Sequence, residues 1–484
     1  MSSTRAVTQT RWEAVIGLEV HVQLRTARKL FCGDRVVFGD EPNSHVCPVC
    51  LGLPGALPTT NPEAVALAVR TALALGCTVH ERAVWARKNY FYPDLSKGYQ
   101  ITQLDHPIAT DGLVAYDGAA GEASVRIRRA HMEEDAGKSI HDRVPDGTAV
   151  DLSRAGTPLV EIVTEPDLRN SGDTRAFLTS LKQLLEYVEV SDCNMEEGSL
   201  RVDANVSVRP MGEQRLGAKT EIKNVNSFSG VEKAIDVEIA RQISLIESGA
   251  RVEQETLLWD DHRNVLRSMR SKEESHDYRY FPDPDLPPLA VSRTEVERSR
   301  AALPELPRAR RARFEREYAL SAYDAGVLTQ ARAGADYFEA VATKSGKAKQ
   351  AANWVMGPAQ ALMHQRGEDA TSFAVRPDAL ATILDMVAAG TISEASGKTV
   401  LGAVAQDGGE PSDIVAARGL VQVRDDSALE AWVREVVDAH PDEVARFKGG
   451  EAKLVGFFVG QVMKRSGGKA DPKRVSELLR GALG

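Results

Sequence analysis

The sequence predicts an α+β protein in which a mainly antiparallel sheet is followed by a helical region. Alternating apolar and polar residues, typical of strands with one buried face, occur in segments 14–24, 125–132, 159–163 and 200–208. Helical stretches separate these strands, but the two do not alternate strictly, as a doubly wound parallel sheet would require. From residue 292 onward, Ala- and Arg-rich runs with helical spacing replace the strands.

Two helices of the first part carry clear start and stop signals. Asn61 followed by Pro62 is typical of a helix N-cap and first turn, and Gly76 is placed to end that helix. After Ser227, apolar residues recur every three or four positions until Gly249. Both segments are therefore predicted to be amphipathic helices beside the sheet.

The length of 484 residues predicts more than one core. The proline-rich segment 281–289 marks the exit from the first domain, and the Gly-Gly-Glu-Pro segment at 408–411 separates two helical parts. We therefore expect three domains, covering residues 1–291, 292–405 and 406–484.

Charge and hydropathy exclude several classes of protein. The net charge of -9 argues against a generally basic nucleic-acid coat. Residues 444–484 contain nine basic and three acidic residues, so this tail is the best candidate for contact with a phosphate backbone. No signal peptide and no apolar run of membrane-spanning length is visible, and we expect a cytoplasmic protein without membrane association.

Two of the expected strands have one apolar and one polar face. The polar faces carry Glu19, His21 and Gln23 in the first strand and Arg201, Asp203, Asn205 and Ser207 in the second. Residues two apart on a strand lie roughly 6.5 Å apart on the same face, close enough to serve one cation. Such a face is either solvated or lines a polar cleft, and for one strand alone solvation is the simpler interpretation.

Further acidic residues lie on neighbouring strands. Segment 131–138 contains Glu134 among several carboxylates, and Glu161 lies inside an apolar strand, where an unpaired carboxylate is costly. We expect a cation beside Glu161, either an arginine or a metal ion. A buried ion pair and a functional metal site are equally good interpretations of Glu161 alone. A histidine with several carboxylates suits Mg²⁺ better than zinc, and Mg²⁺ indicates nucleotide chemistry. The sequence contains neither a P-loop nor a Rossmann fingerprint.

Basic residues able to face phosphates accompany these strands. The candidates for binding a nucleotide are Arg87, Lys88, Lys97, Arg201, Lys219 and Lys223. Aromatic residues are interleaved with the first of them at Tyr90, Phe91 and Tyr92. For each residue taken singly, a solvated surface or ordinary packing remains the default interpretation.

The cysteine spacing predicts a zinc knuckle rather than disulfide bonds. An odd number of cysteines in a long chain does not suggest a disulfide framework: Cys32, Cys47, Cys50, Cys77 and Cys193. The Cys47-x-x-Cys50 pair together with Cys32 offers three thiols, and Asp34 and His45 are the candidates for a fourth ligand. Plain burial of the thiols is the alternative, and the last two cysteines are expected to be structural.

Long, irregular motifs resemble one known family. They are IGLEVHVQL, CPVCLGLPGALP, ARKNYFYPDLSKGYQI, HMEEDAGKS, DLSRAGTPLVEIVTEPD, MEEGSLRVDANVSVR, EIKNVNSF, QET and DYRYFPDPDLPPL. In this order they resemble the B subunits of aspartyl/glutamyl-tRNA amidotransferases, the GatB family. The tail segment EAKLVGFFVGQVMKRSGGKADP resembles the family's YqeY-like tRNA-binding domain.

This resemblance implies a fold, an activity and partners. The first domain is expected to be a catalytic cradle similar to glutamine synthetase, followed by an all-α domain and the YqeY-like tail. The activity implied is that of a carbon–nitrogen ligase: ATP phosphorylates the side-chain carboxylate of misacylated Glu-tRNA(Gln) or Asp-tRNA(Asn). Ammonia, which the amidase (the A subunit) releases from glutamine, then displaces the phosphate. The implied heterotrimer also contains a small C subunit.

The resemblance also implies site residues. Matching motif to motif places the family's magnesium site on Glu19, His21, Glu134 and Glu161, with Asp203 nearby as a fifth catalytic residue. Zinc-bearing members carry C-x-C before C-x-x-C, whereas this chain has Asp34 at the second of these positions. The family's usual D-x-N-R-x-G also differs, because Ser153 replaces the asparagine.

Three other functions compete with this interpretation. A tRNA-binding scaffold without its own catalysis would have no reason to keep Glu161 in an apolar strand. The archaeal paralogue, known as the E subunit, carries an inserted domain for which this chain has no matching segment. A ligase acting on a free amino acid would not need the basic tail.

Overall fold

The computed structural model describes residues 12–141, 145–269, 278–423 and 425–483. The chain divides into two compact units between Leu306 and Pro307. The first unit combines a large sheet with five helices among its described residues, and the second is helical. The predicted change from a mixed to a helical region is thus confirmed. The division into three domains at residues 291 and 405 stays a prediction.

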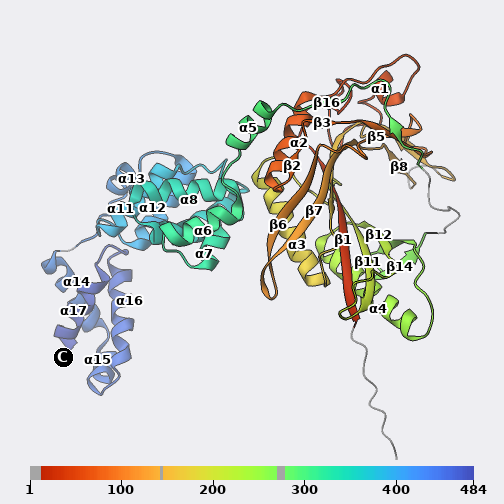
Figure 1. Cartoon of the computed structure of the whole chain (residues 1–484). Helices are drawn as coiled ribbons and strands as arrows, with labels where there is room; N and C mark the ends of the chain where they lie inside the picture. The colour runs from red at the N-terminus through yellow and green to blue at the C-terminus, as the bar shows by residue number, and fades with distance from the viewer. Residues whose placement is uncertain (1–11, 142–144, 270–277, 424, 484) are drawn as a thin grey trace, which may run out of the picture. The chain divides into compact units, whose positions relative to one another are not determined.

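A nine-stranded sheet organises the first unit, in the order β14-β13-β12-β11-β1-β10-β7-β6-β2 (Figure 1). The strands are β1 (Trp12–Gln23), β2 (Thr78–Val79), β6 (Ala109–Gly118), β7 (Gly121–Glu134), β10 (Pro158–Thr164), β11 (Leu200–Pro210), β12 (Thr220–Val225), β13 (Thr256–Asp260) and β14 (Val265–Ser268). Neighbouring strands are antiparallel except β12 and β13, which are parallel. The mainly antiparallel sheet expected from the sequence is confirmed.

Short strands complete the first unit. They form three small sheets, from β15 (Phe281–Pro282), β4 (Ala86–Asn89) and β5 (Tyr99–Thr102), from β16 (Leu289–Ala290) and β3 (Arg82–Ala83), and from β8 (Lys138–Ile140) and β9 (Ala149–Asp151). Phe281 of β15 pairs with Arg87 of β4, so the proline-rich segment belongs to the first unit.

Helices cover one face of the large sheet. They are α3 (Ser171–Tyr187) and α4 (Phe228–Glu247), which contact each other and strands β6 and β11 (Figure 1). The apolar residues of β1, such as Val20, are buried in the same core as Leu178 of α3 and Val231 of α4. The opposite face of the sheet is therefore left to the polar side chains of the same strands.

The predicted helix start signals are confirmed. Asn61 caps α2 (Pro62–Ala74) by accepting a hydrogen bond from the Glu63 backbone N–H, and Ser227 caps α4 by accepting one from Gly230. The first unit also contains α1 (Pro48–Leu51) and α5 (Arg293–Ala301).

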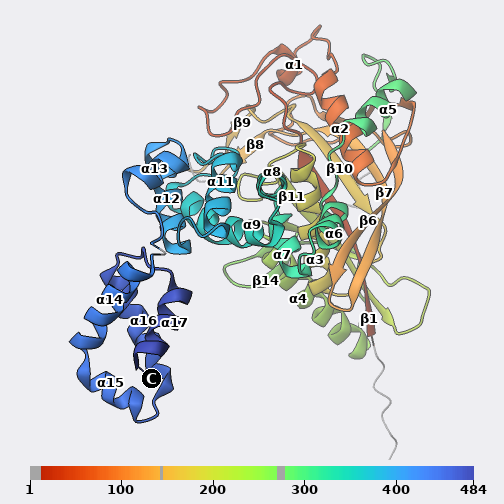
Figure 2. The ribbon, with the colours of Figure 1, turned by 90° about the vertical axis from the view of Figure 1, so that its left-hand side faces the viewer.

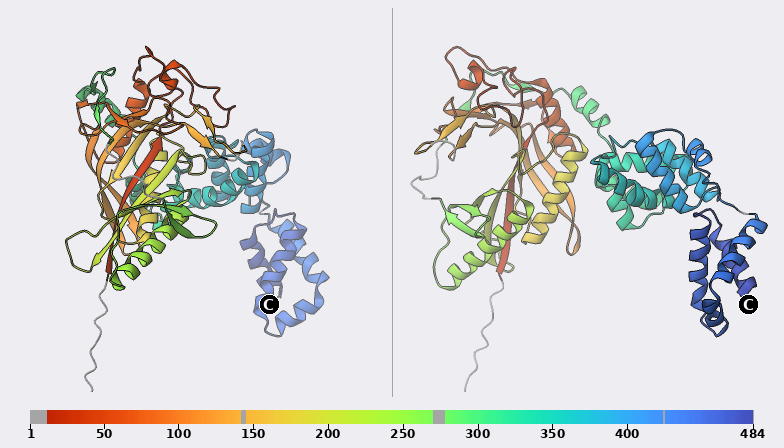
Figure 3. Two further views of the ribbon diagram at one scale, coloured as in Figure 1. Left: turned by 90° about the vertical axis from the view of Figure 1, so that its right-hand side faces the viewer. Right: turned by 180° about the vertical axis from the view of Figure 1, so that it is seen from behind.

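The second unit is helical throughout its described residues (Figures 2 and 3). The helices are α6 (Pro307–Glu317), α7 (Ala322–Leu328), α8 (Arg332–Ser345), α9 (Ala348–Trp354), the π-helix η1 (Val355–Ala359), α10 (Gln360–Arg366), α11 (Pro377–Ala388), α12 (Glu394–Asp407), α13 (Pro411–Ala417), α14 (Asp426–Ala439), α15 (Pro441–Lys448), the 3₁₀-helix η2 (Ala452–Leu454), α16 (Val455–Arg465) and α17 (Pro472–Leu483). One apolar cluster surrounds Phe338, and a separate one surrounds Phe458. Within the described ranges, no helix has the length and apolar character needed to span a membrane.

Candidate active site

One row of side chains crosses the polar face of the large sheet. The strand register pairs His131 of β7 with Glu161 of β10, Glu161 with His21 of β1, and His21 with Arg201 of β11. Directly paired residues of an antiparallel sheet project to the same face. Residues that are far apart in the sequence therefore meet as cross-strand neighbours.

Glu161 is the centre of this row. Its Oε2 atom lies 3.4 Å from His21 Nε2 and 3.3 Å from His131 Nε2, and Glu133 Oε1 lies 3.6 Å from His21 Nε2. Glu161, Glu133 and His131 are buried. Sequence reasoning expected an arginine or a metal ion at Glu161. Among the described residues, the ion-pair partners of Glu161 are not arginines but two histidines, because the register places one on each side of it. The metal ion stays a prediction.

The electrostatics of the row favour charged forms. Burial lowers the pKa of His21, but the hydrogen bond to Glu161 and the negative charges of Glu133 and Glu161 outweigh it and raise the pKa overall. Burial acts to raise the pKa of Glu161, yet the charge of His131 and the hydrogen bonds from both histidines lower it well below its usual range. The row therefore holds an ionised carboxylate between two imidazoles.

A second acidic group lies beside the first on the same face. Glu19 of β1 pairs with Asp203 of β11, and oxygens of Glu19, Asp203 and Glu221 lie within 4.8 Å of one another. Lys223 Nζ lies 2.7 Å from Asp203 and 3.0 Å from Glu221. Burial and the charges of Glu161 and Glu221 raise the pKa of Glu19. The predicted Glu19 and His21 thus belong to two neighbouring groups rather than one.

Glu134 is the predicted ligand that the structure does not bring to either group. It forms an ion pair with Lys97 and accepts a hydrogen bond of 2.9 Å from the Ile101 backbone N–H. Because successive residues of a strand point to opposite faces, Glu133 faces His21 and Glu134 faces away. In the structure Glu133, and not Glu134, groups with His21 and Glu161; the role of Glu134 as a metal ligand stays a prediction.

Four of the six predicted nucleotide-binding cations already have carboxylate partners: Lys97 and Lys223, as described above, and the two arginines. Arg87 Nε lies 2.7 Å from Asp283, and a second nitrogen lies 2.8 Å from Asp285. Arg201 donates a 3.0 Å hydrogen bond to Asp135, which is buried next to the row. These two arginines are engaged in ion pairs and are therefore less free to meet a phosphate.

Two predicted lysines have no carboxylate within ion-pair distance among the described residues. Lys88 Nζ lies 4.9 Å from the ring centre of Tyr278 and 5.8 Å from that of Tyr90. Burial lowers the pKa of Lys88, but the charge of Glu133 and other groups outweighs it and raises the pKa. Lys219 donates a 3.0 Å hydrogen bond to Asn205, which in turn donates to Glu19. Both lysines therefore offer positive charge to the polar face.

The donor set fits a hard divalent cation. Ligand atoms of His21, Glu133 and Glu161 lie within 4.8 Å of one another, and three carboxylates form the neighbouring group. Carboxylate oxygens with one imidazole suit Mg²⁺ and leave room for water or phosphate oxygens. Sequence analysis counted His131 and Glu133 among the nearby candidates, but the ligand set taken from the motif comparison omitted them, and Glu221 was not named. The alternation along segment 131–134 was the signal that could have identified the first two.

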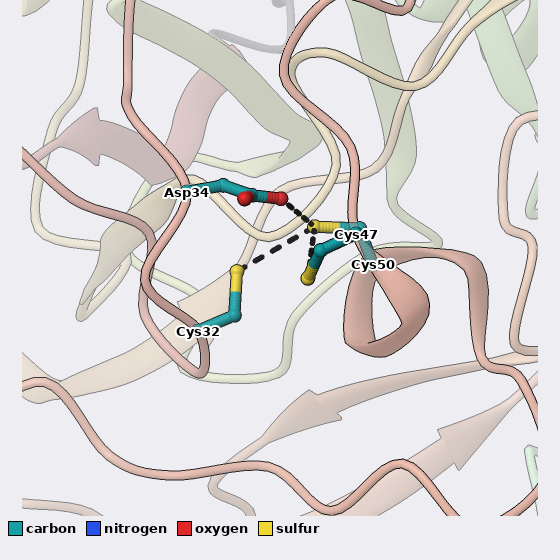
Figure 4. Close-up of side chains that lie close together, drawn as sticks. All are labelled: Cys32, Asp34, Cys47 and Cys50. Atoms are coloured by element: carbon teal, nitrogen blue, oxygen red, sulfur yellow. Dashed lines mark hydrogen bonds between the residues drawn. The ribbon is translucent and has the colours of Figure 1, made fainter.

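The predicted cysteine knuckle comes together near α1. Cys32, Cys47 and Cys50 gather with Asp34, and Cys50 Sγ contacts the other three side chains (Figure 4). The hydrogen bond from Cys32 and the nearby Lys29 ammonium lower the pKa of Cys50 to about 6, despite burial. The thiols are not paired in disulfides. Three thiols and a carboxylate are a donor set that zinc accepts.

Known proteins share this sequence over nearly its full length. Residues 14–297 match the family described as GatB/GatE catalytic domain, and residues 336–483 match the family described as GatB domain. The chain is 50% identical over 473 residues to the B subunit of the aspartyl/glutamyl-tRNA(Asn/Gln) amidotransferase of Myxococcus xanthus, covering 98% of this chain and 99% of the relative. Proteins of the same name from Anaeromyxobacter sp. (strain K) and Carboxydothermus hydrogenoformans are 52% and 49% identical, again over 98% of this chain and 99% of each relative.

Proposed function

The chain belongs to the GatB family, and from that premise we propose that it is the carboxylate-activating subunit of a tRNA-dependent amidotransferase. Its substrates are ATP and a glutamate or aspartate that is esterified to tRNA(Gln) or tRNA(Asn). The product is the corresponding amide. The sheet of the first unit serves as a catalytic cradle similar to that of glutamine synthetase. That enzyme activates a carboxylate in the same way.

The observation that carries this proposal is the pair of adjacent acidic groups on one face of the sheet. Glu19 and His21 are two residues apart on β1, and each belongs to a different group. Two neighbouring sets of hard ligands can each hold a magnesium ion, and the two ions can bind a triphosphate and a carboxylate side by side. A surface used only for binding RNA gains nothing from buried acidic residues, because they repel phosphates.

The chemistry proceeds in two balanced steps. A side-chain carboxylate oxygen of the aminoacyl group attacks the γ-phosphorus of ATP, the bond to the β-phosphate oxygen breaks, and ADP leaves. Ammonia then attacks the acyl carbon, inorganic phosphate leaves, and the nitrogen loses a proton. No side-chain nucleophile of this chain is needed, which agrees with the acid- and lysine-rich character of the site.

The residues of the site have distinct tasks in this scheme. His21, Glu133 and Glu161 would hold one magnesium ion and Glu19, Asp203 and Glu221 a second. Bound magnesium supplies positive charge that screens the attack of one anion on another.

Lys88 contributes positive charge of its own. The Tyr90 and Tyr278 rings hold its ammonium group beside the acidic row, and no carboxylate among the described residues lies close enough to neutralise it. A partly desolvated ammonium interacts more strongly with a phosphoryl group than a fully hydrated one. Lys88 is thereby positioned to bind a phosphate of ATP.

The partners follow from the reaction. This scheme gives the chain no glutamine-hydrolysing step, so ammonia has to come from an amidase, the A subunit, in a complex with a small C subunit.

The basic tail binds the tRNA backbone. Three of its arginines, Arg446, Arg465 and Arg474, form ion pairs with carboxylates. Five lysines and one arginine remain without such a partner among the described residues: Lys448, Lys453, Lys464, Lys469, Lys473 and Arg480.

Reconstitution tests this proposal. The chain is combined with the amidase and the small third protein of the heterotrimer, and each misacylated tRNA is offered with ATP, Mg²⁺ and glutamine. Amide formation that requires ATP, and that stops when His21→Ala is introduced into this chain, supports the proposal. Amide formation without ATP would instead favour a tRNA-binding scaffold whose partner performs the chemistry.

A further inference from the structure

Four side chains near α1 have the spacing of a tetrahedral metal site. Cys50 Sγ lies 3.5 Å from Cys32 Sγ, 3.8 Å from Cys47 Sγ and 3.2 Å from Asp34 Oδ2 (Figure 4). With zinc–sulfur bonds of about 2.3 Å and zinc–oxygen bonds of about 2.0 Å, a tetrahedral site has sulfur–sulfur edges of about 3.8 Å and sulfur–oxygen edges of about 3.5 Å. The observed separations are close to these edges.

We propose that the four residues form a Cys₃Asp zinc site in which Asp34, and not His45, is the fourth ligand. The imidazole of His45 is engaged elsewhere, because its Nε2 atom lies 2.7 Å from Asp40 Oδ2. His45 is not part of the group of ligand atoms that lie within 4.8 Å of one another. The site is separate from the acidic groups of the large sheet and does not depend on the proposed transfer chemistry.

Local backbone structure explains why Asp34 reaches the thiols. The Lys29 backbone N–H donates a 2.9 Å hydrogen bond to the Asp34 carbonyl, and Arg28 pairs with Arg35. These contacts close a tight loop with Cys32 near its tip, so Cys32 and Asp34 present their side chains from one short segment. Cys47 and Cys50 come from the start of α1. Two short segments thus supply two ligands each, as in zinc knuckles.

A buried lysine provides an independent sign of concentrated negative charge. The Lys29 side chain is fully buried, and its Nζ atom lies 3.3 Å from Cys50 Sγ and 2.6 Å from the His45 carbonyl oxygen. A buried ammonium group is costly unless anions surround it. Three thiolates and one carboxylate around Zn²⁺ leave an excess of two negative charges, of which Lys29 compensates one.

The site also connects to the turn that carries Lys97. Ser96 donates a 2.6 Å hydrogen bond to the Cys50 carbonyl oxygen, and Lys97 forms the ion pair with Glu134 described above. A zinc ion that fixes α1 would therefore fix the Ser96 hydroxyl and, through the backbone, the neighbouring lysine. The role assigned to the metal is structural: it holds the turn beside the sheet.

The first measurement is the metal content and ligand set of the full-length chain, purified without chelators. Elemental mass spectrometry should find about one zinc per chain. X-ray absorption at the zinc edge should find three sulfur ligands and one light ligand. A chain that contains no zinc after expression in zinc-supplemented medium would overturn the proposal.

Three variants identify the fourth ligand. Asp34→Ala should lose zinc to a competing chelator at least roughly tenfold faster than the wild type. Replacing a residue that only hydrogen-bonds to a metal ligand already weakens binding by about that factor, and a direct ligand should matter at least as much. Asp34→Cys should keep the metal and raise the sulfur count from three to four, which tests the position even if Asp34→Ala folds poorly. His45→Ala is the matched control and should retain zinc as the wild type does.

Two results would contradict the assignment of Asp34. One is equal zinc retention in Asp34→Ala and the wild type. The other is an unchanged sulfur count in Asp34→Cys together with loss of zinc in His45→Ala. Hydrogen exchange provides a further readout, because amides of the turn at residues 95–98 should exchange faster in Asp34→Ala than in His45→Ala.

Discussion

Glu161 and His21 are direct cross-strand neighbours, and Glu161 Oε2 lies 3.4 Å from His21 Nε2. This pairing brings together two residues that are far apart in the sequence, and they form part of one site. It also explains how a carboxylate is tolerated within an otherwise apolar strand, since His131 meets it from the other side. Hydrogen bonds from the two imidazoles offset part of the cost of burying the carboxylate.

Replacing Glu161 by glutamine should abolish most of the activity. Glutamine keeps the shape but removes the charge that binds a cation, so we expect kcat to fall by roughly 100-fold or more. ATP-dependent amidation by the reconstituted complex measures the effect. Binding of misacylated tRNA should stay within about twofold of the wild type, because the site lies away from the basic tail in the sequence. Turnover like that of the wild type would remove Glu161 from the site.

The adjacent residues Glu133 and Glu134 should respond differently to the same substitution. Glu133→Gln removes a charge that faces His21, and kcat should fall by roughly 100-fold. Glu134→Gln instead breaks the ion pair with Lys97, and the unfolding free energy should fall by about 1–3 kcal/mol. Activity assays and urea titrations of both variants separate these effects. A larger catalytic loss in Glu134→Gln would restore the assignment made from the sequence motif alone.

Lys88 should contribute to ATP binding. In Lys88→Met the apparent KM for ATP should rise by roughly tenfold, because one desolvated phosphate contact is lost, while Lys88→Arg should recover part of the affinity. Steady-state kinetics at varied ATP measures both variants. Lys182, which is paired with Glu186 on α3, supplies the control. If Lys182→Met raised the KM as much as Lys88→Met, the assignment would fail.

The lysines of the tail should control the salt dependence of tRNA binding. Replacing Lys448, Lys453 and Lys464 by glutamine removes up to three phosphate contacts, and the slope of log K against log salt should flatten by about 0.7–0.9 per contact. Filter binding at several salt concentrations measures the slope. Lys398→Gln on α12 provides a control whose slope should match the wild type. An unchanged slope in the triple variant would exclude these lysines from the interface.

The aromatic cluster of the second unit should be essential for its stability. Phe338 is fully buried, and its ring centre lies 5.0 Å from that of Phe314. Phe338→Ala should lower the unfolding free energy of that unit by about 3–5 kcal/mol through loss of burial and a new cavity. Tyr323, which is 77% exposed, is the control, and Tyr323→Ala should change stability by less than about 0.5 kcal/mol. Urea denaturation followed by circular dichroism tests both.

Sequence periodicity was sufficient for the local structure. The alternation in segment 14–24 correctly placed Glu19 and His21 on one face of β1, and Asn61 correctly marked the start of α2. These features depend on neighbouring residues alone, so a single sequence contains them. The strand order did not follow from periodicity, because long-range pairing determines it.

The same limit explains the differences at the site. Glu133 and Glu134 are adjacent. Alternation places Glu133 on the same face as His131, but the register of β7 against β10 is needed to show that this face meets His21. The partners of Glu161 come from two other strands, so composition could not distinguish histidines from an arginine. At the cysteines, the sequence left Asp34 and His45 open as the fourth ligand; in the structure Asp34 lies with the thiols, whereas His45 contacts Asp40.

The most direct test of the central claim follows oxygen from the substrate carboxylate. The side-chain carboxylate of Glu-tRNA(Gln) or Asp-tRNA(Asn) is labelled with ¹⁸O and converted by the reconstituted complex with ATP and glutamine. Activation through an acyl phosphate predicts one ¹⁸O atom in each inorganic phosphate released, because the carbon–oxygen bond breaks in the second step. Amide formation accompanied by unlabelled phosphate would contradict carboxylate phosphorylation in this cradle.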